Sequence, residues 1–385
     1  MTESLADNSS GEESGLRETL RSKLARILKG RTLAQCIADG PDNIGQLRLL
    51  AALMVVLGHS NLGGGGRWPY DPVHLVLPQA QVHAVGLMFF FMISGLLITY
   101  SFLRQPNLLR FLRARVLRLW PALFICVFAW AFLLGPALSE LPLRDYFSFT
   151  RSDSPYLYIW RNAKLFNLQN VLPGLFKSNP LPIQVNTPLW SIPVEAQMYL
   201  WVAAVGVLRL LRLPWLTSIA IVLLFGALIF WPMLHGENPT LDWIVRGFFG
   251  AGAIACLLRD RVPISSGVMV TLLLACLFAS RTTHALPFFW IAVGYFVLWF
   301  AYVPQLPKIP FGLDASYGVY LWGWPVQQSL VHLTGVDEPL LLFAMAAPIV
   351  LALGAASWLC IERPALKLKD VRFFRARSGT LASGV

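Results

Sequence analysis

The stretch HAVGLMFFFMISGLLITYSFL, residues 83–103, contains no Asp, Glu, Lys or Arg and is long enough to cross a bilayer as a helix. Over the whole chain of 385 residues, apolar residues make up 56% and charged residues only 13%. Soluble domains carry about 25% charged residues. The chain also contains 14 Trp, 10 Tyr and 25 Phe. This composition excludes a disordered or disulfide-stapled chain, argues against a soluble enzyme and predicts an integral membrane protein.

Charged residues, Pro and Gly divide the sequence into ten apolar stretches of comparable length. We therefore predict an all-α polytopic membrane protein, a bundle of about ten transmembrane helices. The expected spans are residues 46–63, 83–103, 116–136, 188–210, 214–234, 241–258, 264–280, 286–303, 313–333 and 338–361. Together they predict one membrane domain over 46–361, between an N-terminal tail, 1–45, and a basic C-terminal tail, 362–385.

The net charge of +11 reflects a one-sided distribution of basic residues. With the N-terminus in the cytoplasm, 22 of the 31 Lys and Arg residues lie on the cytoplasmic side, seven lie outside and two lie within spans. Membrane proteins concentrate positive charge in their cytoplasmic loops. The sequence therefore predicts a protein of the inner (plasma) membrane whose two termini both lie in the cytoplasm. The basic excess does not indicate a nucleic-acid partner.

Two segments outside the spans have patterns of their own. Residues 15–39 place leucines four residues apart, such as Leu16 and Leu20, among basic residues. This fits either a helix lying on the anionic membrane surface or an ordinary charged tail. Residues 137–187 are expected on the outside, and they are too long for a simple connection, so they are candidates to cover an acceptor site. The five cysteines stand singly, so neither a disulfide framework nor a metal site is expected.

The first span, LRLLAALMVVLGHS at 47–60, carries two ionisable side chains at membrane depth. Arg48 and His59 lie roughly 16 Å apart along a helix and within roughly 20–30° of the same face. Charges in such positions are costly and usually face a functional cavity. A snorkelling Arg and an interfacial His would give the same pattern. Imidazole is the side chain best matched to proton transfer near neutral pH, so His59 is a candidate functional residue.

Two arginines stand at the expected cytoplasmic end of the third span. Arg115 and Arg118 are three residues apart and so share a helical face. Guanidinium groups bind phosphates in a bidentate manner, which makes this pair a candidate anion site. Membrane anchoring by positive charge is the simpler interpretation of either arginine alone.

A carboxylate lies inside the fourth span, in the segment NTPLWSIPVEAQMYL at 186–200. Glu195 comes two turns after the start of this span, which is expected to run inward, so its depth is close to that of His59. An unpaired carboxylate there would be costly, and His59 is the expected partner. Pairing with Arg246 and a purely structural role are the alternatives. Tyr199 follows Glu195 by one helical turn.

Taken in order, these segments resemble the acyltransferase-3 family of integral-membrane acyltransferases. The matching pieces, from about residue 44 to 366, are Arg48 with His59, FFFMISGLLITY at 89–100, Arg115 and Arg118 before Trp120-Pro121, LWSIPVEAQMYL at 189–200, ASYGVYLWGWPV at 315–326 and IERP at 361–364. The resemblance implies transfer of an acyl group, commonly acetyl from acetyl-CoA, to a hydroxyl of a cell-envelope or extracellular glycan, lipid-linked sugar or glycosylated small molecule. It also implies that His59 is catalytic and that the three arginines bind the donor, and Glu195 matches the family's carboxylate.

Two positions depart from the family pattern. Gly323 stands in YLWGWP at 320–325, where the family often has a histidine, so a second imidazole is absent there. Gly45 stands where the family often has an Asp, so a partner that would orient Arg48 is missing. We expect the membrane domain alone, without the extracellular hydrolase-like domain that some members carry.

These residues suggest a reaction in which acyl-CoA is a co-substrate and no cofactor or metal is bound. The donor enters from the cytoplasm, His59 removes the proton of the acceptor hydroxyl, and Glu195 orients the imidazole. Candidates to line the pocket, or to carry the acyl group covalently, are Trp190, Tyr199, Ser316, Tyr317 and Tyr320. The alternative function is a secondary transporter or flippase for a glycan or lipid-linked sugar, in which Arg48, His59 and Glu195 relay protons.

Overall fold

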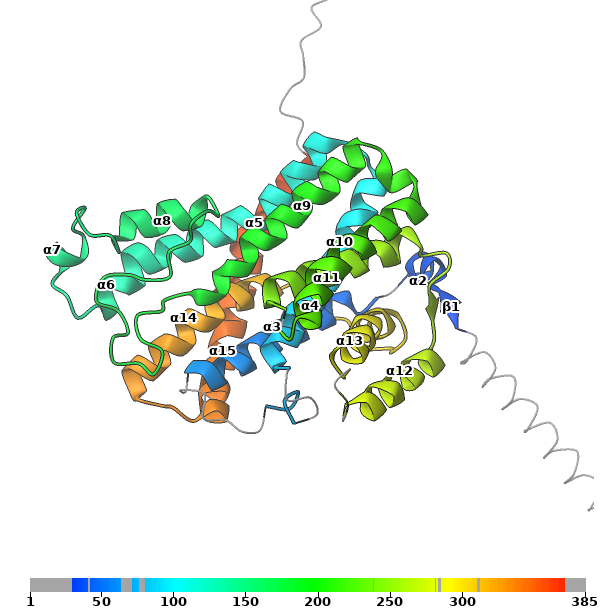
Figure 1. The fold of residues 1–385 in the computed structure, drawn as a ribbon. Helices are drawn as coiled ribbons and strands as arrows, with labels where there is room; N and C mark the ends of the chain where they lie inside the picture. Colours follow the sequence, from blue (N-terminus) through cyan, green and yellow to red (C-terminus); the bar gives the residue numbers. More distant parts are fainter. Residues whose placement is uncertain are drawn as a thin grey trace, which may run out of the picture.

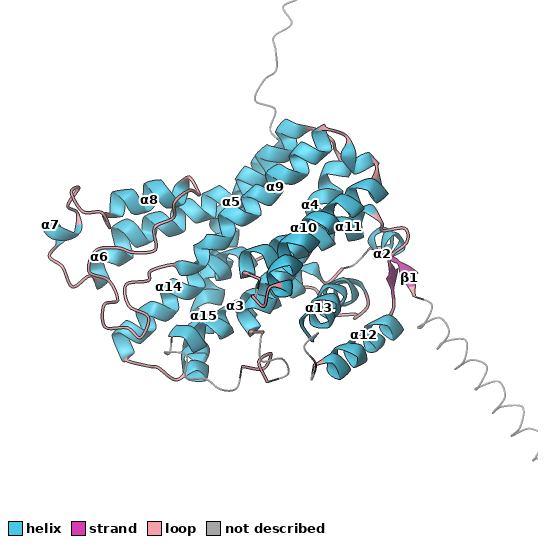
Figure 2. Cartoon of the chain, viewed as in Figure 1, coloured by secondary structure: helices cyan, strands magenta, loops and turns pink. Residues whose placement is uncertain are grey.

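The computed structural model describes residues 30–370 except 41, 64–70, 76–79, 238, 281, 283–284 and 310–311. The surface helix expected over 15–39 therefore lies mostly outside the described residues, as does most of the tail after 361. Within the described part the regular secondary structure is helical apart from β1 (Arg31–Thr32) and β2 (Pro263–Ile264), two short strands that pair antiparallel. Figure 2 shows these strands beside α2 (Leu33–Asp39), at one edge of the helices.

Each of the ten predicted spans is a helix (Figure 1). They are α3 (Ile44–Gly63), α4 (Val82–Arg104), α5 (Leu108–Ala129), α9 (Ser191–Val207), α10 (Pro214–Leu234), α11 (Leu241–Leu257), α12 (Ser266–Ala279), α13 (Ala285–Tyr302), α14 (Ser316–Thr334) and α15 (Pro339–Ser357). Two of these helices continue through a π-helical turn into a short helix. Helix α5 is followed by η1 (Trp130–Leu134) and α6 (Gly135–Leu138), and α15 is followed by η5 (Trp358–Glu362) and α16 (Arg363–Lys367). The 3₁₀ turns are η2 (Thr187–Trp190), η3 (Leu210–Arg212) and η6 (Leu368–Asp370).

Five of the described helices are long and apolar enough to cross a membrane. They are Val82–Arg104, Leu108–Leu138, Pro214–Leu234, Ala285–Tyr302 and Pro339–Lys367. The all-helical fold and its membrane character are therefore confirmed. Ten crossings, with both termini in the cytoplasm, stay a prediction.

Helix α4 is packed between α3 and α11. Its crossing with α11 is close because two glycines meet the opposite backbone: a Cβ on Gly95 would collide with Phe249, and one on Gly252 would collide with Met92. Small residues at such crossings let helix backbones approach in a membrane, where packing rather than the hydrophobic effect drives association. This crossing fixes the height and rotation of α4 relative to the helices that carry the candidate site.

Helix α14 packs against both α3 and α15. The amide of Gln327 on α14 donates to the carbonyl of Val56 (2.7 Å) and to Oγ of Ser60 (2.6 Å), both on α3. Interhelical hydrogen bonds of this kind stabilise contacts between membrane helices. They hold the C-terminal end of α3, which carries His59, against α14.

The segment predicted to lie outside, 137–187, is folded into a layer rather than extended. It contains α7 (Leu143–Tyr146) and α8 (Pro155–Ala163), and Figure 1 shows both beside α5 and α6. Its fully buried Tyr158 lies on α8, which packs along α5. Nδ2 of Asn179 donates to the carbonyl of Gln328 on α14 (2.9 Å). This layer therefore packs over the C-terminal half of α14.

Candidate active site

Two arginines and two carboxylates form a partly buried group where α3, α5, α14 and η5 meet. Arg118, only 9% exposed, donates from Nη2 to Oδ2 of Asp314 (2.9 Å) and from Nη1 to Oε2 of Glu362 (3.0 Å). Arg48 donates from Nη1 to the same Oδ2 of Asp314 (3.1 Å). Asp314 thus bridges the two arginines. We call Arg48, Arg118, Asp314 and Glu362 the ion cluster.

Hydroxyl groups support both carboxylates of the ion cluster. Ser316 Oγ donates to Oδ1 of Asp314 (2.6 Å), and Ser357 Oγ donates to Oε1 of Glu362 (2.9 Å). Asp314 lies before the first residue of α14. The guanidinium groups of Arg48 and Arg118 both face its carboxylate. Asp314 therefore orients Arg48 in place of the acid missing at position 45.

Arg48 lines two cavities. The first, of about 330 Å³, lies at the N-terminal end of α3, and Gln46, Lys308 and Asp314 also line it. The second, of about 30 Å³, lies between α3, α4, α9 and α14, where Arg48 and Glu195 are its charged residues. We call the first the vestibule and the second the internal cavity. Arg48 stands between them.

Glu195 accepts hydrogen bonds from Ser94 Oγ on α4 (3.0 Å) and from the hydroxyl of Tyr199. The guanidinium of Arg115 lies over the Tyr199 ring, 5.7 Å from its centroid. Nε of Arg115 is buried and has no hydrogen-bond partner among the described residues. Glu195 and Tyr199 thus pair as their spacing suggested, and Arg115 packs on Tyr199 without being among the described lining residues of either cavity.

His59 lies near the C-terminal end of α3 and is 8% exposed. Its ring contacts that of His83 in the first turn of α4 (centroids 5.3 Å apart) and meets the edge of Trp324 on α14 (5.1 Å). Within the described part of the chain, no hydrogen bond or ion pair joins His59 to Glu195. The expected pair is therefore not formed, and the imidazole beside His59 belongs to His83, which carries no spacing signal in the sequence.

Arg246, the alternative partner for Glu195, bonds elsewhere. Its Nε donates to Oδ2 of Asp242 (3.1 Å), and its Nη2 donates to Oε1 of Gln197 (2.8 Å). The bond to Gln197 ties α11 to α9, and Arg246 is not among the described residues that line the internal cavity.

The aromatic candidates separate into two groups. Tyr317 and Tyr320 line the internal cavity; Tyr317 donates to the carbonyl of Leu119 (2.9 Å), and the Tyr320 hydroxyl bonds with Ser191 Oγ (2.6 Å). Trp190, in η2, is partly buried against the core and is absent from the described linings of both cavities. Tyr317 and Tyr320 are thus placed to contact a bound molecule, and Trp190 is not.

Sequence reasoning missed Asp314 and Glu362 as site residues, although both stand in or next to segments that carry the family resemblance. Asp314 directly precedes ASYGVYLWGWPV, and Glu362 lies within IERP. The position of each carboxylate at the boundary of an apolar span could have indicated a site residue, because charged groups at membrane depth usually pair with an opposite charge. Their meeting at Arg118 could not be read from spacing, since the three residues are far apart in the chain.

The fold and this site define a helical membrane protein with a partly buried ion cluster between a vestibule and an internal cavity. A family model described as an acyltransferase domain matches residues 42–359. The chain belongs to the acyltransferase-3 family, as its sequence motifs predicted.

Two relatives cover most of the chain. Nodulation protein 10 of Rhizobium leguminosarum bv. viciae is 30% identical over 361 residues, which is 85% of this chain and 94% of that protein. The O-acetyl transferase of Shigella phage Sf6 is 24% identical over 335 residues, 82% of this chain and 93% of that protein. No solved structure matches the chain. The prediction of a membrane acyltransferase is thereby confirmed.

Proposed function

We propose that this acyltransferase moves an acyl group, acetyl in the first instance, from cytoplasmic acyl-CoA to a hydroxyl of a cell-envelope or extracellular glycan or glycosylated acceptor. The relative named O-acetyl transferase supports the acetyl group. The observation that carries the proposal is the position of Arg48 on both the vestibule and the internal cavity. In this proposal the protein crosses the inner membrane ten times with both termini in the cytoplasm, so the vestibule opens to the compartment that holds acyl-CoA.

The donor phosphates bind at Arg48 and Arg115. Each guanidinium has five N–H donors in a planar arrangement suited to phosphate oxygens. The buried Nε of Arg115 without a described partner supports its role, and Lys308 adds positive charge at the vestibule. Both Nη atoms of Arg118 are engaged by carboxylates, so Arg118 positions Arg48 through Asp314 rather than contacting the donor.

In this proposal the internal cavity, about 30 Å³ in this structure, widens to admit the pantetheine arm past Tyr317 and Tyr320. The arm then brings the thioester toward His59. The imidazole of His59 removes the acceptor hydroxyl proton as that oxygen attacks the thioester carbonyl. The carbon–sulfur bond breaks, and the CoA thiolate leaves and takes up the proton, so the reaction yields an ester and a thiol. His83 packs against the His59 ring and positions it, as the sequence suggested for Glu195. Glu195 instead binds the Tyr199 hydroxyl beside the donor path.

The product tests this proposal directly. Cells that express the protein should yield envelope or secreted glycans heavier by the mass of one acetyl group than those of cells lacking it. Mass spectrometry of intact glycans measures this difference, and labelled acetyl-CoA supplied to inverted membrane vesicles should transfer its label. Glycans of unchanged mass that nevertheless cross the membrane in a protein-dependent way would contradict acyl transfer and indicate the transporter instead.

Replacing His83 by alanine is expected to lower kcat by about 10- to 100-fold, less than the 10²–10⁴-fold associated with a direct proton-transfer group. The change removes the imidazole that lies against the His59 ring and leaves the vestibule intact, so KM for acetyl-CoA should stay within about twofold. Turnover of acetyl-CoA in proteoliposomes measures both constants. The exposed His74 gives a matched control, H74A, which should behave as the unmodified protein. A H83A enzyme with full kcat would exclude His83 from the mechanism.

A further inference from the structure

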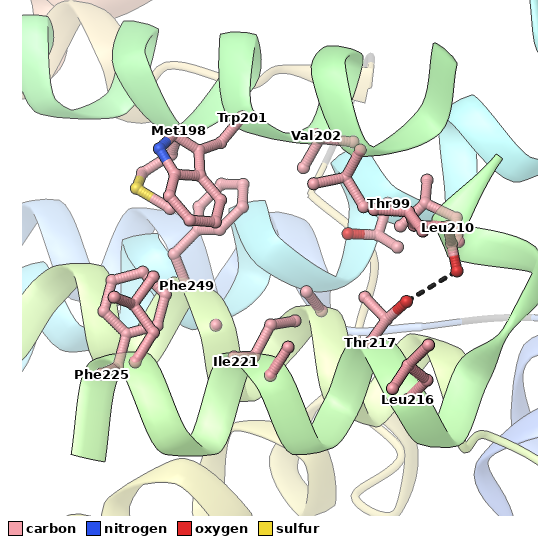
Figure 3. A pocket seen from close by; sticks show the side chains of 16 residues that line it. Thr99, Met198, Trp201, Val202, Leu210, Leu216, Thr217, Ile221, Phe225 and Phe249 are labelled. Atoms are coloured by element: carbon pink, nitrogen blue, oxygen red, sulfur yellow. Dashed lines mark hydrogen bonds between the residues drawn. The ribbon is translucent and has the colours of Figure 1, made fainter. Parts of the chain in front are cut away.

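Helices α4, α9, α10 and α11 surround an apolar cavity of about 380 Å³ that lies apart from the ion cluster. Figure 3 shows Trp201 and Val202 of α9 facing Ile221 and Phe225 of α10 across it. Small-molecule pockets range over roughly 300–1,000 Å³. None of the described residues that line it is charged. The cavity is therefore suited to a hydrocarbon chain.

The cavity exists because α10 packs on α11 rather than on α9. Gly250 of α11 lets α10 approach closely: a Cβ there would stand 2.9 Å from side-chain atoms of Ile221 and of Phe225. At the other end, Arg209 adopts a left-handed conformation (φ 61°) that ends α9, and η3 turns the chain into α10. The tight turn holds the two helices together at one end, and packing on α11 leaves a gap along the rest.

One polar atom on the wall of this cavity has no partner. Oγ1 of Thr99 on α4 is buried and makes no hydrogen bond within the described residues. Figure 3 places Thr99 at the end near Leu210 and Thr217, where the hydroxyl of Thr217 donates to the carbonyl of Leu210 (2.6 Å). A buried hydroxyl without a partner is unfavourable. A ligand with an ester carbonyl at this end would accept its hydrogen bond.

Basic side chains gather at the same end. Arg209 and Arg212 are exposed and flank Leu210 and Leu211, both of which line the cavity. The guanidinium of Arg261 lies over the ring of Trp215, 5.2 Å from its centroid. Trp215 directly precedes Leu216 in the sequence, and Leu216 lines the cavity. Arginines at the membrane surface attract anionic lipids. The apolar cavity thus ends in a positively charged rim.

We propose that this cavity binds one acyl chain of an anionic glycerophospholipid. The chain lies between α9 and α10, its ester carbonyl accepts from Thr99 Oγ1, and its phosphate lies at Arg209 and Arg212. The lipid comes from the leaflet that contains these arginines. Because α9 also carries Glu195 and Tyr199, the bound lipid stabilises the helix that forms one wall of the internal cavity.

The test uses the purified full chain, stripped of lipid in detergent and titrated with dioleoyl phosphatidylglycerol or dioleoyl phosphatidylcholine. Native mass spectrometry should show at least about tenfold tighter binding of the anionic lipid, and only that lipid should raise the unfolding temperature substantially. The double variant R209Q/R212Q should lose most of this preference. A220F, which places a ring in the cavity, should lose binding of the anionic lipid.

A matched control lies on another apolar groove of α10, lined by Val222, Gly226, Ala227, Phe230, Trp231 and other apolar residues. The variant A227F fills that groove and should leave binding unchanged. Equal binding of the two lipids by the unmodified protein would overturn the proposal. So would an unchanged preference in R209Q/R212Q, or anionic-lipid binding that survives A220F.

Discussion

Replacement of His59 by alanine is expected to lower kcat for acyl transfer by about 10²–10⁴-fold, the usual contribution of general acid–base catalysis. The imidazole is buried between His83 and Trp324, at the far end of α3 from the vestibule. Donor binding at Arg48 is therefore separate, and KM for acetyl-CoA should change by less than about threefold. Steady-state kinetics in proteoliposomes, with the acceptor identified from the glycan analysis, measures both values.

A partly buried histidine elsewhere provides the control for H59A. His332, near the end of α14, contacts the ring of Phe176 and lies outside the linings of the vestibule and the internal cavity. H332A should keep full activity even if it loses some stability. If H59A expressed at the normal level and retained full activity, His59 would not be the base, and a covalent intermediate on a residue such as Tyr199 would have to be tested instead.

The second large effect is expected from Asp314→Asn. Asparagine keeps the size of the side chain but removes the charge that holds Arg48 and Arg118, so KM for acetyl-CoA should rise at least tenfold. Breaking a buried ion pair costs about 3–5 kcal/mol, and partial exposure reduces this, so we expect a loss of about 1–3 kcal/mol in unfolding free energy. Thermal unfolding in detergent and donor-dependent kinetics measure the two effects.

The control for D314N is D242N, which weakens the ion pair between Asp242 and Arg246 outside the site. It should leave KM unchanged. An unchanged KM and unfolding temperature in D314N would contradict the bridging role.

The apolar pattern predicted the helices well but not all of their ends. Helix α5 begins at Leu108, eight residues before the expected span, because Asn107 caps it by accepting from the amide of Arg110 (2.9 Å). A hydropathy pattern marks the part of a helix that suits the bilayer interior, and the charged first turns extend beyond that part. The helices within 137–187 were missed for a related reason, since they are short and carry no span-length pattern.

The candidate site was predicted in part. The positions of Arg48, His59, Arg115, Arg118 and Glu195 along their helices followed from the sequence, as did their family. Their neighbours did not. Helical spacing relates residues within one helix, whereas Asp314 and Arg48 are 266 residues apart and meet only because α14 packs on α3.

By itself, the sequence determined that the chain is helical, that it belongs in a membrane and that it is an acyltransferase. Hydrophobicity sorts residues by depth, so it also determined which charges would lie within the bundle. Only the tertiary structure decided which helices are neighbours. Close glycine crossings and interhelical hydrogen bonds rotate each helix about its axis, and that rotation placed His83 rather than Glu195 against His59.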